Sequence, residues 1–244
     1  MERSSQHPSL ILHTRPYGES HLFTDLLTRD RGLLSATAYG ARSQRGSLRG
    51  SIVPFAYGTA YLYFTPRSGA FKITDFDVQR YFLSVRESLD ALYSASLWAE
   101  IILRTYGGGG EDERVLSGLV SALDLLEKVV EEHRPESHIG RLTAQWIWRY
   151  AELQGVQPEL PAANVPDRYF VPGNYGFVRQ SQGALELLDG TTRYLRYTAS
   201  LSLEETLAVP MRPETEKNLK GFIVLLAQDL VHGSLNSLHS GWVP

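Results

Sequence analysis

Residues 40–50 form a short polar segment that is rich in arginine and contains no acidic side chain. It carries Arg42, Arg45 and Arg49 among glycines and serines. A guanidinium group is permanently charged and binds phosphate in a bidentate manner, while glycine and serine let a backbone approach closely and add donors. The segment is too polar and too glycine-rich for a strand, so we expect a long loop that follows a phosphate backbone.

The surrounding region is basic although the whole chain has a net charge of -3. Residues 11–72 hold eight basic and three acidic side chains, a net charge of +5, whereas residues 73–244 hold 15 basic and 23 acidic ones, a net charge of -8. A merely solvated face is the alternative, but such a face usually mixes both signs. The predicted phosphate contacts are Arg15, Arg29, Arg31, Arg42, Arg45, Arg49, Arg67 and Lys72.

Aromatic side chains accompany these cations and are suited to stacking on unpaired bases. They are Tyr17, Tyr39, Tyr57, Tyr61, Tyr63, Phe64 and Phe71. The alternative is that most of them fill a hydrophobic core. We take Tyr39 as the best stacking candidate, and we expect Tyr61 and Tyr63, which share a strand face, in the core or at a domain interface.

The elements that must position these residues are short strands. Apolar alternation marks five segments, residues 9–17, 21–29, 32–40, 52–64 and 70–78, separated by Gly, Pro, Ser or Asp-Arg-Gly turns. Five closely spaced strands are typical of a small barrel such as the oligonucleotide-binding (OB) fold, and an SH3-like barrel fits nearly as well.

Beyond residue 81 the apolar spacing changes to three and four residues, which indicates amphipathic helices. We predict helices over residues 82–106, 113–133, 138–155 and about 213–233, and a short one over 201–209. Residues 155–197 are rich in Pro, Gly and Asn, with extended pieces at 168–172 and 176–180. The expected α+β architecture is therefore a barrel over 1–80, a helical domain over 81–154 and 198–244, and a small insert over 155–197.

Nothing in the sequence predicts an enzyme. It contains no nucleophile elbow, zinc-protease helix, dinucleotide fingerprint or nucleotide-binding loop, and without cysteine it has neither thiolate chemistry nor cysteine zinc sites. Asp75 and Asp77 are expected to be solvated, and a proline between His133 and His138 breaks their helical register. Because no secretory signal or long apolar segment is present, we expect a cytosolic protein.

Four motifs in order resemble the N-terminal domain of the bacterial RecO family. They are HTRPYGES at residues 13–20, LLTRDRG at 26–32, AYGAR at 38–42 and PF at 54–55. The frame of residues 153–160 and 168–172 also resembles RecO proteins, in many of which the insert is a zinc ribbon built by four cysteines. Since the cysteines are missing here, we predict a degenerate ribbon without metal or any other cofactor, held by packing of Tyr169, Phe170 and Phe177.

The resemblance implies a recombination mediator of DNA repair, located in the bacterial cytoplasm at the nucleoid. Such a protein binds single- and double-stranded DNA, anneals complementary strands and, with RecR, helps load the RecA recombinase onto strands covered by single-strand-binding protein. The acidic helical region beyond residue 81 is expected to bind proteins, including the C-terminal tail of single-strand-binding protein. Candidate contacts for that tail are Arg104, Arg141, Arg149 and Lys220, which could instead balance nearby acids. The alternative function is a non-catalytic scaffold whose basic barrel binds an acidic protein.

Overall fold

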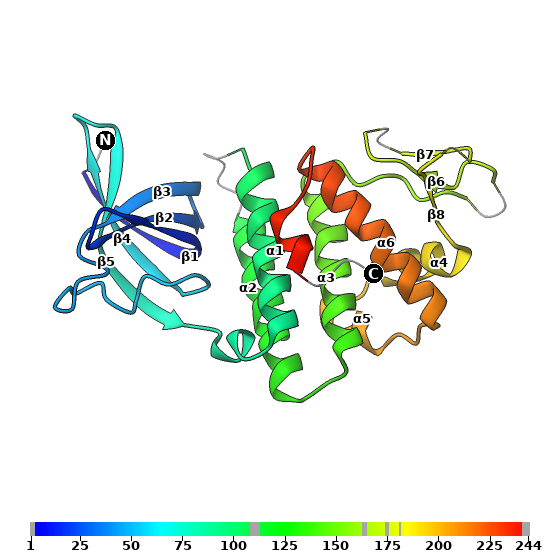
Figure 1. Cartoon of the computed structure of the whole chain (residues 1–244), viewed down its shortest axis with the longest axis horizontal. Coiled ribbons are helices and arrows are strands. Elements are labelled where there is room, and N and C mark those ends of the chain that lie inside the picture. The colour runs from blue at the N-terminus through cyan, green and yellow to red at the C-terminus, as the bar shows by residue number, and fades with distance from the viewer. Residues whose placement is uncertain (1–2, 108–112, 163–164, 174–175, 181, 241–244) are drawn as a thin grey trace. The chain divides into compact units, whose positions relative to one another are not determined.

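A computed structural model describes residues 3–107, 113–162, 165–173, 176–180 and 182–240 (Figure 1). The strands are β1 (Ser4–Tyr17), β2 (His21–Thr28), β3 (Gly32–Ala38), β4 (Tyr57–Thr65), β5 (Ala70–Arg80), β6 (Tyr169–Phe170), β7 (Phe177–Val178) and β8 (Leu185–Glu186). The helices are α1 (Leu89–Thr105), α2 (Glu113–Glu131), α3 (Glu136–Leu153), α4 (Asp189–Thr198), α5 (Leu203–Ala208) and α6 (Pro213–Leu230), with 3-10 turns at Leu83–Arg86 and Asn236–Ser240. Residues 1–83 and 106–121 make one compact unit, and residues 84–105 and 122–244 make a second.

The first unit contains a closed five-stranded barrel in the order β1-β2-β3-β5-β4. Neighbouring strands are antiparallel except for β3 and β5, which run parallel, and β1 closes the barrel by pairing with both β2 and β4. This order and the parallel β3–β5 pair are those of an OB-fold, so the α+β prediction and the choice of barrel are confirmed. The SH3-like alternative is wrong.

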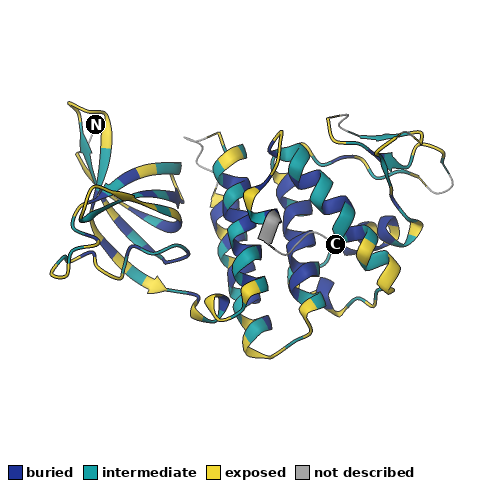
Figure 2. Cartoon of the chain, viewed as in Figure 1, coloured by how far each residue is buried: buried dark blue, intermediate teal, exposed yellow. Residues whose placement is uncertain are grey.

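Period-two alternation builds the barrel core, because successive side chains of a strand point to opposite faces. The inward positions include Ile11, Leu26, Leu62 and Ile73, each at most 3% exposed (Figure 2). Tyr61, by contrast, is 37% exposed, which places it on the outer face of β4. Leu62, the buried residue between Tyr61 and Tyr63, has the inward position, so these two tyrosines do not fill the barrel core. The other expected place, a domain interface, stays a prediction.

Residues 39–56 join β3 to β4 by a series of turns. Strand β4 begins at Tyr57 and not at residue 52 as predicted, because Phe55 has a φ of 65° that no strand allows. The backbone N–H of Phe55 instead donates to the Ile11 carbonyl at 2.7 Å. Leu48 and Ile52 are buried in the barrel core, so this connection packs against the barrel.

The second unit is a helical bundle in which α3 packs against α1, α5 and α6. The rings of Trp98, Trp146 and Tyr150 stack in series, with centroid distances of 5.3 and 5.1 Å. Helix α1 starts at Leu89, later than predicted, because the chain first makes the 3-10 turn at Leu83–Arg86 and Ser88 then accepts the Ala91 N–H at 3.4 Å. No helix in the described ranges has the length and apolar character needed to span a bilayer.

Strands β6, β7 and β8 form a small sheet in the order β7-β6-β8. Its aromatic residues pack onto α6, where the ring of Phe222 lies 5.1 Å from Phe170 and 5.8 Å from Phe177, so the predicted aromatic packing is confirmed for Phe170 and Phe177. The predicted insert ends in helix α4, which the sequence interpretation missed. Its buried face is largely threonine, a residue with low helix propensity, so its apolar stripe is weak.

Candidate nucleic-acid interface

A row of outward side chains crosses four strands of the barrel. Arg15 on β1 pairs with Phe23 on β2, Phe23 with Thr37 on β3, and Thr37 with Lys72 on β5. Paired residues of adjacent strands share one face of a sheet, so these four side chains lie side by side. The Arg15 guanidinium lies 4.4 Å from the centroid of the Phe23 ring, a cation–π contact that holds the charge over this face.

A second group of aromatic residues lies beside this row. The ring of His21 is 4.9 Å from that of Tyr39 and 6.4 Å from that of Tyr17, and the Lys72 ammonium lies 5.3 Å from the centroid of Tyr39. Tyr17 and Tyr39 are 53% and 48% exposed. The predicted residues Tyr39 and Lys72, separated by more than thirty positions in the chain, are therefore brought together by the parallel pairing of β3 with β5.

The arginine-rich loop begins immediately after Tyr39. Backbone N–H groups of residues 43, 46 and 49 each donate to the carbonyl three positions earlier, and the Arg42 N–H donates to the Ser20 carbonyl at 3.0 Å. Gly46 is required here, because a Cβ at that position would lie 2.0 Å from the Gly40 carbonyl oxygen. The loop is thus folded against the β1–β2 turn, with the side chains of Arg42, Arg45 and Arg49 exposed.

Two of the predicted contacts lie elsewhere on the barrel. Arg29 and Arg31 belong to the β2–β3 turn, at the opposite end of β2 from His21, a separation of about 25 Å at the usual rise per strand residue. Arg29 also pairs with Glu113 at 3.1 Å. Arg67 is exposed on the β4–β5 turn. The predicted basic residues therefore do not form one patch.

A buried histidine secures the β2–β3 turn and was missed by the sequence interpretation. His7, 3% exposed, places Nδ1 at 2.7 and 2.8 Å from the carboxylate oxygens of Asp30 and Nε2 at 2.8 Å from the Ser5 hydroxyl. The Arg29 N–H donates to the Pro8 carbonyl at 3.0 Å. A histidine in a period-two strand pattern gives no sign of a partner 23 residues away, so only the tertiary structure reveals this contact.

The four candidate tail contacts lie in the second unit, where three have partners within the bundle. Arg104 donates to the carbonyls of Ser234 and Val231, which anchors the C-terminal segment on α1. Arg141 donates to the Val209 carbonyl at 3.1 Å and pairs with Glu216 at 3.3 Å.

Arg149 donates to the carbonyls of Thr198 and Leu201 at 3.2 and 2.6 Å, and burial lowers its pKa. Lys220 packs across Gly140, where an added Cβ would lie 2.8 Å from the lysine Cε. The alternative that these cations balance nearby acids is supported for Arg104, which pairs with Glu100, and for Arg141, which pairs with Glu216. Arg149 instead bonds to backbone carbonyls.

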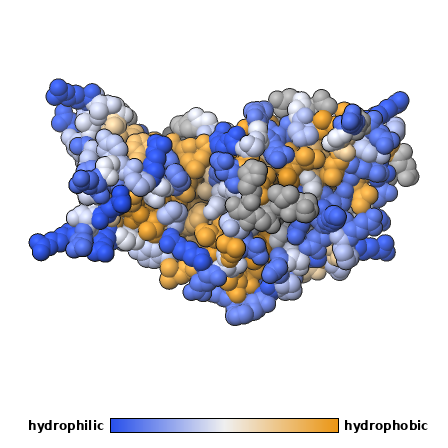
Figure 3. Space-filling model, in the orientation of Figure 1, coloured by the Kyte–Doolittle hydropathy of each residue, from blue (hydrophilic) through white to orange (hydrophobic). Residues whose placement is uncertain are grey.

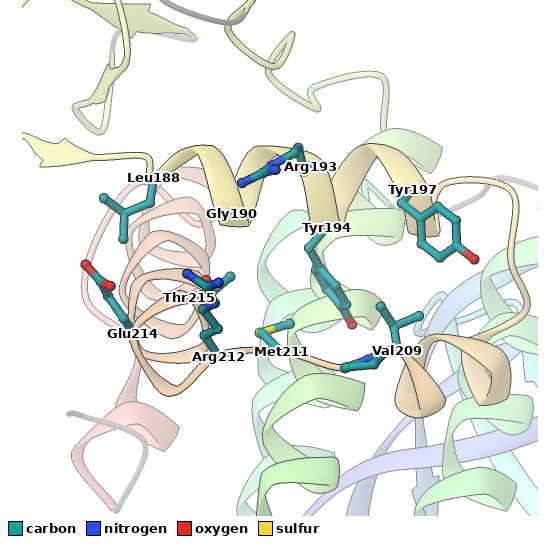
Figure 4. A pocket seen from close by; sticks show the side chains of 11 residues that line it. Leu188, Gly190, Arg193, Tyr194, Tyr197, Val209, Met211, Arg212, Glu214 and Thr215 are labelled. Carbon is teal, nitrogen blue, oxygen red and sulfur yellow. The ribbon is translucent and has the colours of Figure 1, made fainter.

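A pocket of about 560 Å³ lies between α4 and the segment that joins α5 to α6 (Figure 4). Tyr194 forms a buried wall, and because burial raises its pKa the hydroxyl stays protonated and donates to the Thr206 carbonyl at 3.3 Å. Tyr197 is 65% exposed. Arg193, Arg212 and Glu214 line the pocket, so its lining has two basic side chains and one acidic one within an acidic region.

Comparison with known proteins shows which protein family this chain is similar to. A family model described as "Recombination protein O N terminal" matches residues 1–82, the part of the chain that contains the barrel. DNA repair protein RecO of Rubrobacter xylanophilus is 31% identical over 80% of this chain and 81% of its own length. The chain belongs to the RecO family. RecO of Gloeobacter violaceus is 26% identical over 84% of this chain and 75% of its own, and that of Chromobacterium violaceum is 45% identical over 22% of each.

Membership of the RecO family implies a role in DNA repair and accounts for both units, because the matches to the Rubrobacter and Gloeobacter proteins extend far beyond the barrel. The zinc ribbon of many RecO proteins does not fit this chain. The sequence has no cysteine, and the described residues contain no group of three His, Asp or Glu side chains that could hold a metal ion. Packing of Phe170 and Phe177 on α6 holds the small sheet instead.

Proposed function

We propose that this protein is a non-catalytic recombination mediator that binds single- and double-stranded DNA through the outer face of its barrel. The observation that supports this proposal is that Arg15 lies over the Phe23 ring and Lys72 over the Tyr39 ring, and that neither cation is paired with a carboxylate among the residues that the structure describes. Their charge thus remains available for phosphate. Figure 3 shows hydrophilic side chains projecting from the barrel on the face that it draws.

The mechanism requires no covalent step. Arginines that neutralise phosphates release condensed counterions, and shielding of two backbones lets complementary bases pair. Affinity should fall with a log–log salt slope of about -0.7 per phosphate contacted on a single strand. Acting with RecR, the bound protein would then help RecA replace single-strand-binding protein. The expected phosphate contacts remain those predicted. Of these, Arg15 and Lys72 lie over aromatic rings, and Arg42, Arg45 and Arg49 are exposed on the loop that follows Tyr39.

Annealing of two complementary fluorescent oligonucleotides tests this proposal. Changing Arg42, Arg45 and Arg49 together to alanine should weaken DNA binding at least tenfold at moderate salt and slow annealing, because about three phosphate contacts are lost. The comparison variant is Arg29→Ala with Arg31→Ala, which removes two predicted phosphate contacts at the opposite end of β2. Its effect should be smaller, because only two charges are lost and Arg29 is already paired with Glu113. Equal losses in both variants would contradict the loop assignment, and a wild-type protein without DNA binding would favour the protein scaffold.

The tail of single-strand-binding protein is proposed to occupy the pocket between α4 and α6. Arg193 and Arg212 outnumber the one lining acid, Glu214, and the pocket also presents the apolar side chains of Val209 and Met211, which suits a segment that is both acidic and apolar. Fluorescence anisotropy with a labelled tail peptide should show weaker binding in Arg193→Ala with Arg212→Ala. The control Lys217→Ala removes an exposed charge from α6 outside the residues that line the pocket, and an equal loss there would contradict the assignment.

A further inference from the structure

Three rings form a continuous aromatic group on the barrel: Tyr17 at the end of β1, His21 at the start of β2 and Tyr39 directly after β3. We call these three residues the ring platform. The two tyrosines flank the histidine and expose 53% and 48% of their surface. Aromatic residues of a core are buried, so this exposure leaves ring surface for a ligand.

His21 ties the ring platform to the arginine-rich loop. Its Nδ1 accepts the backbone N–H of Gly40 at 3.0 Å and lies 3.2 Å from the Ser20 hydroxyl. A backbone N–H can only donate, so Nδ1 is unprotonated and the neutral ring carries its proton on Nε2. Because Gly40 follows Tyr39 directly, this hydrogen bond sets the position of the Tyr39 ring and of the first turn of the loop.

Charge around the ring platform favours a polyanion with aromatic faces. The Lys72 ammonium lies over Tyr39, Arg15 lies over Phe23, and the exposed Arg42 follows Gly40 within two residues. A phosphate backbone can engage these cations whether the nucleic acid is single or double stranded. Only unpaired bases can also place a π-face on Tyr17 and Tyr39, because duplex bases are stacked on one another.

We infer that the ring platform binds unpaired bases, with Tyr17 and Tyr39 as stacking residues and His21 as their positioning residue, so that the barrel selects single-stranded over duplex DNA. The inference rests on the proposed function. It adds which form of nucleic acid the barrel prefers, a stacking role for Tyr17 and a positioning role for His21. Duplex binding then depends on the cations alone. Single-strand binding gains about fivefold to a hundredfold for each base stacked.

The first test compares three ligands of equal length: a single strand, the same strand with abasic sites in place of its bases, and a duplex. Tyr17→Ala and Tyr39→Ala should each weaken binding of the ordinary single strand about tenfold and leave binding of the abasic strand and the duplex unchanged. Tyr61→Ala is the matched control, since Tyr61 is exposed on β4 of the same barrel, outside the ring platform.

Two substitutions separate the hydrogen bond of His21 from its ring. His21→Asn keeps an acceptor near the Gly40 N–H, whereas His21→Phe keeps an aromatic ring without an acceptor. If His21 positions Tyr39, then His21→Phe should lose most of the preference for the ordinary strand over the abasic one, with faster exchange of the Gly40 amide, and His21→Asn should retain most of it. The opposite order would overturn the positioning role.

The outcomes distinguish the inference from the function on which it rests. If the wild-type protein binds ordinary and abasic strands equally, the ring platform does not stack on bases, although the protein still binds DNA. If it binds none of the three ligands, the proposed function itself fails. A loss in Tyr61→Ala as large as in Tyr39→Ala would also contradict the ring platform.

Discussion

Removal of the Asp30 carboxylate should loosen the barrel, because it leaves Nδ1 of the buried His7 ring without its partner, while Nε2 keeps the Ser5 hydroxyl. The His7 side chain is 4% exposed and that of Asp30 is 53% exposed, so in the native structure Asp30 contacts water and the imidazole is almost entirely shielded from it. A buried donor left unsatisfied costs about 1–3 kcal/mol. We therefore expect Asp30→Ala to destabilise the barrel by about 2 kcal/mol, and Asp30→Asn, whose amide oxygen still accepts, by less than about 1 kcal/mol.

Amide hydrogen exchange measured by mass spectrometry suits this question, because all four tryptophans lie beyond residue 83 and their fluorescence does not report on the barrel strands. Peptides from β1 and β2 should exchange about thirtyfold faster in Asp30→Ala, the factor that corresponds to about 2 kcal/mol. Asp77→Ala is the control, since Asp77 is exposed on β5 and its loss should change stability by no more than about 0.5 kcal/mol.

A double-mutant cycle isolates the contact from the cavity that His7→Ala creates. The two single variants and His7→Ala with Asp30→Ala should give a coupling free energy of about 1–2 kcal/mol. The explanation would be refuted if Asp30→Ala exchanged no faster than Asp77→Ala, or if the two substitutions were additive.

Three further substitutions test other parts of the molecule. Phe222→Ala should destabilise the second unit by about 3–5 kcal/mol in denaturant unfolding followed by tryptophan fluorescence, because the ring packs on Trp148, Phe170 and Phe177; a loss under about 1 kcal/mol would contradict that packing. Gly46→Ala should weaken DNA binding, since its Cβ would meet the Gly40 carbonyl and displace the arginine-rich loop, whereas Gly118→Ala on α2 meets no neighbour and should leave binding unchanged. Burial raises the pKa of Glu100, but hydrogen bonds from Ser237, Asn236 and Arg104 lower it overall, so its stabilising effect should be complete above about pH 4.5 and be lost as the pH falls through the lowered pKa. The protection factor of the Ser237 amide, which is its exchange rate relative to the intrinsic rate at each pH, should fall between pH 7 and pH 3, and Glu100→Gln should make that factor independent of pH.

The local sequence pattern was sufficient to predict a helix or strand where one face of that element packs against the core. The alternation over residues 21–29 and 70–78 predicts β2 and β5 to within two residues, because a strand with one buried face requires period two. The spacing over residues 138–155 likewise predicts α3. The pattern was insufficient in the last part of the insert, where α4 buries Thr191, Thr192 and Thr198 and therefore lacks the apolar stripe that marks a helix.

A basic, strand-rich N-terminal region, an acidic helical region and the motifs of the RecO family are all visible in the sequence, because composition, periodicity and motif spacing are local properties. Which of these residues meet is visible only in the folded chain. Pairing of β3 with β5 brings Lys72 to Tyr39, and the length of β2 separates Arg29 and Arg31 from the arginine-rich loop. Folding of the bundle gives Arg104, Arg141 and Arg149 internal acceptors. The physical reason is that the partner of a charged side chain depends on long-range strand pairing and helix packing, which a local pattern does not encode.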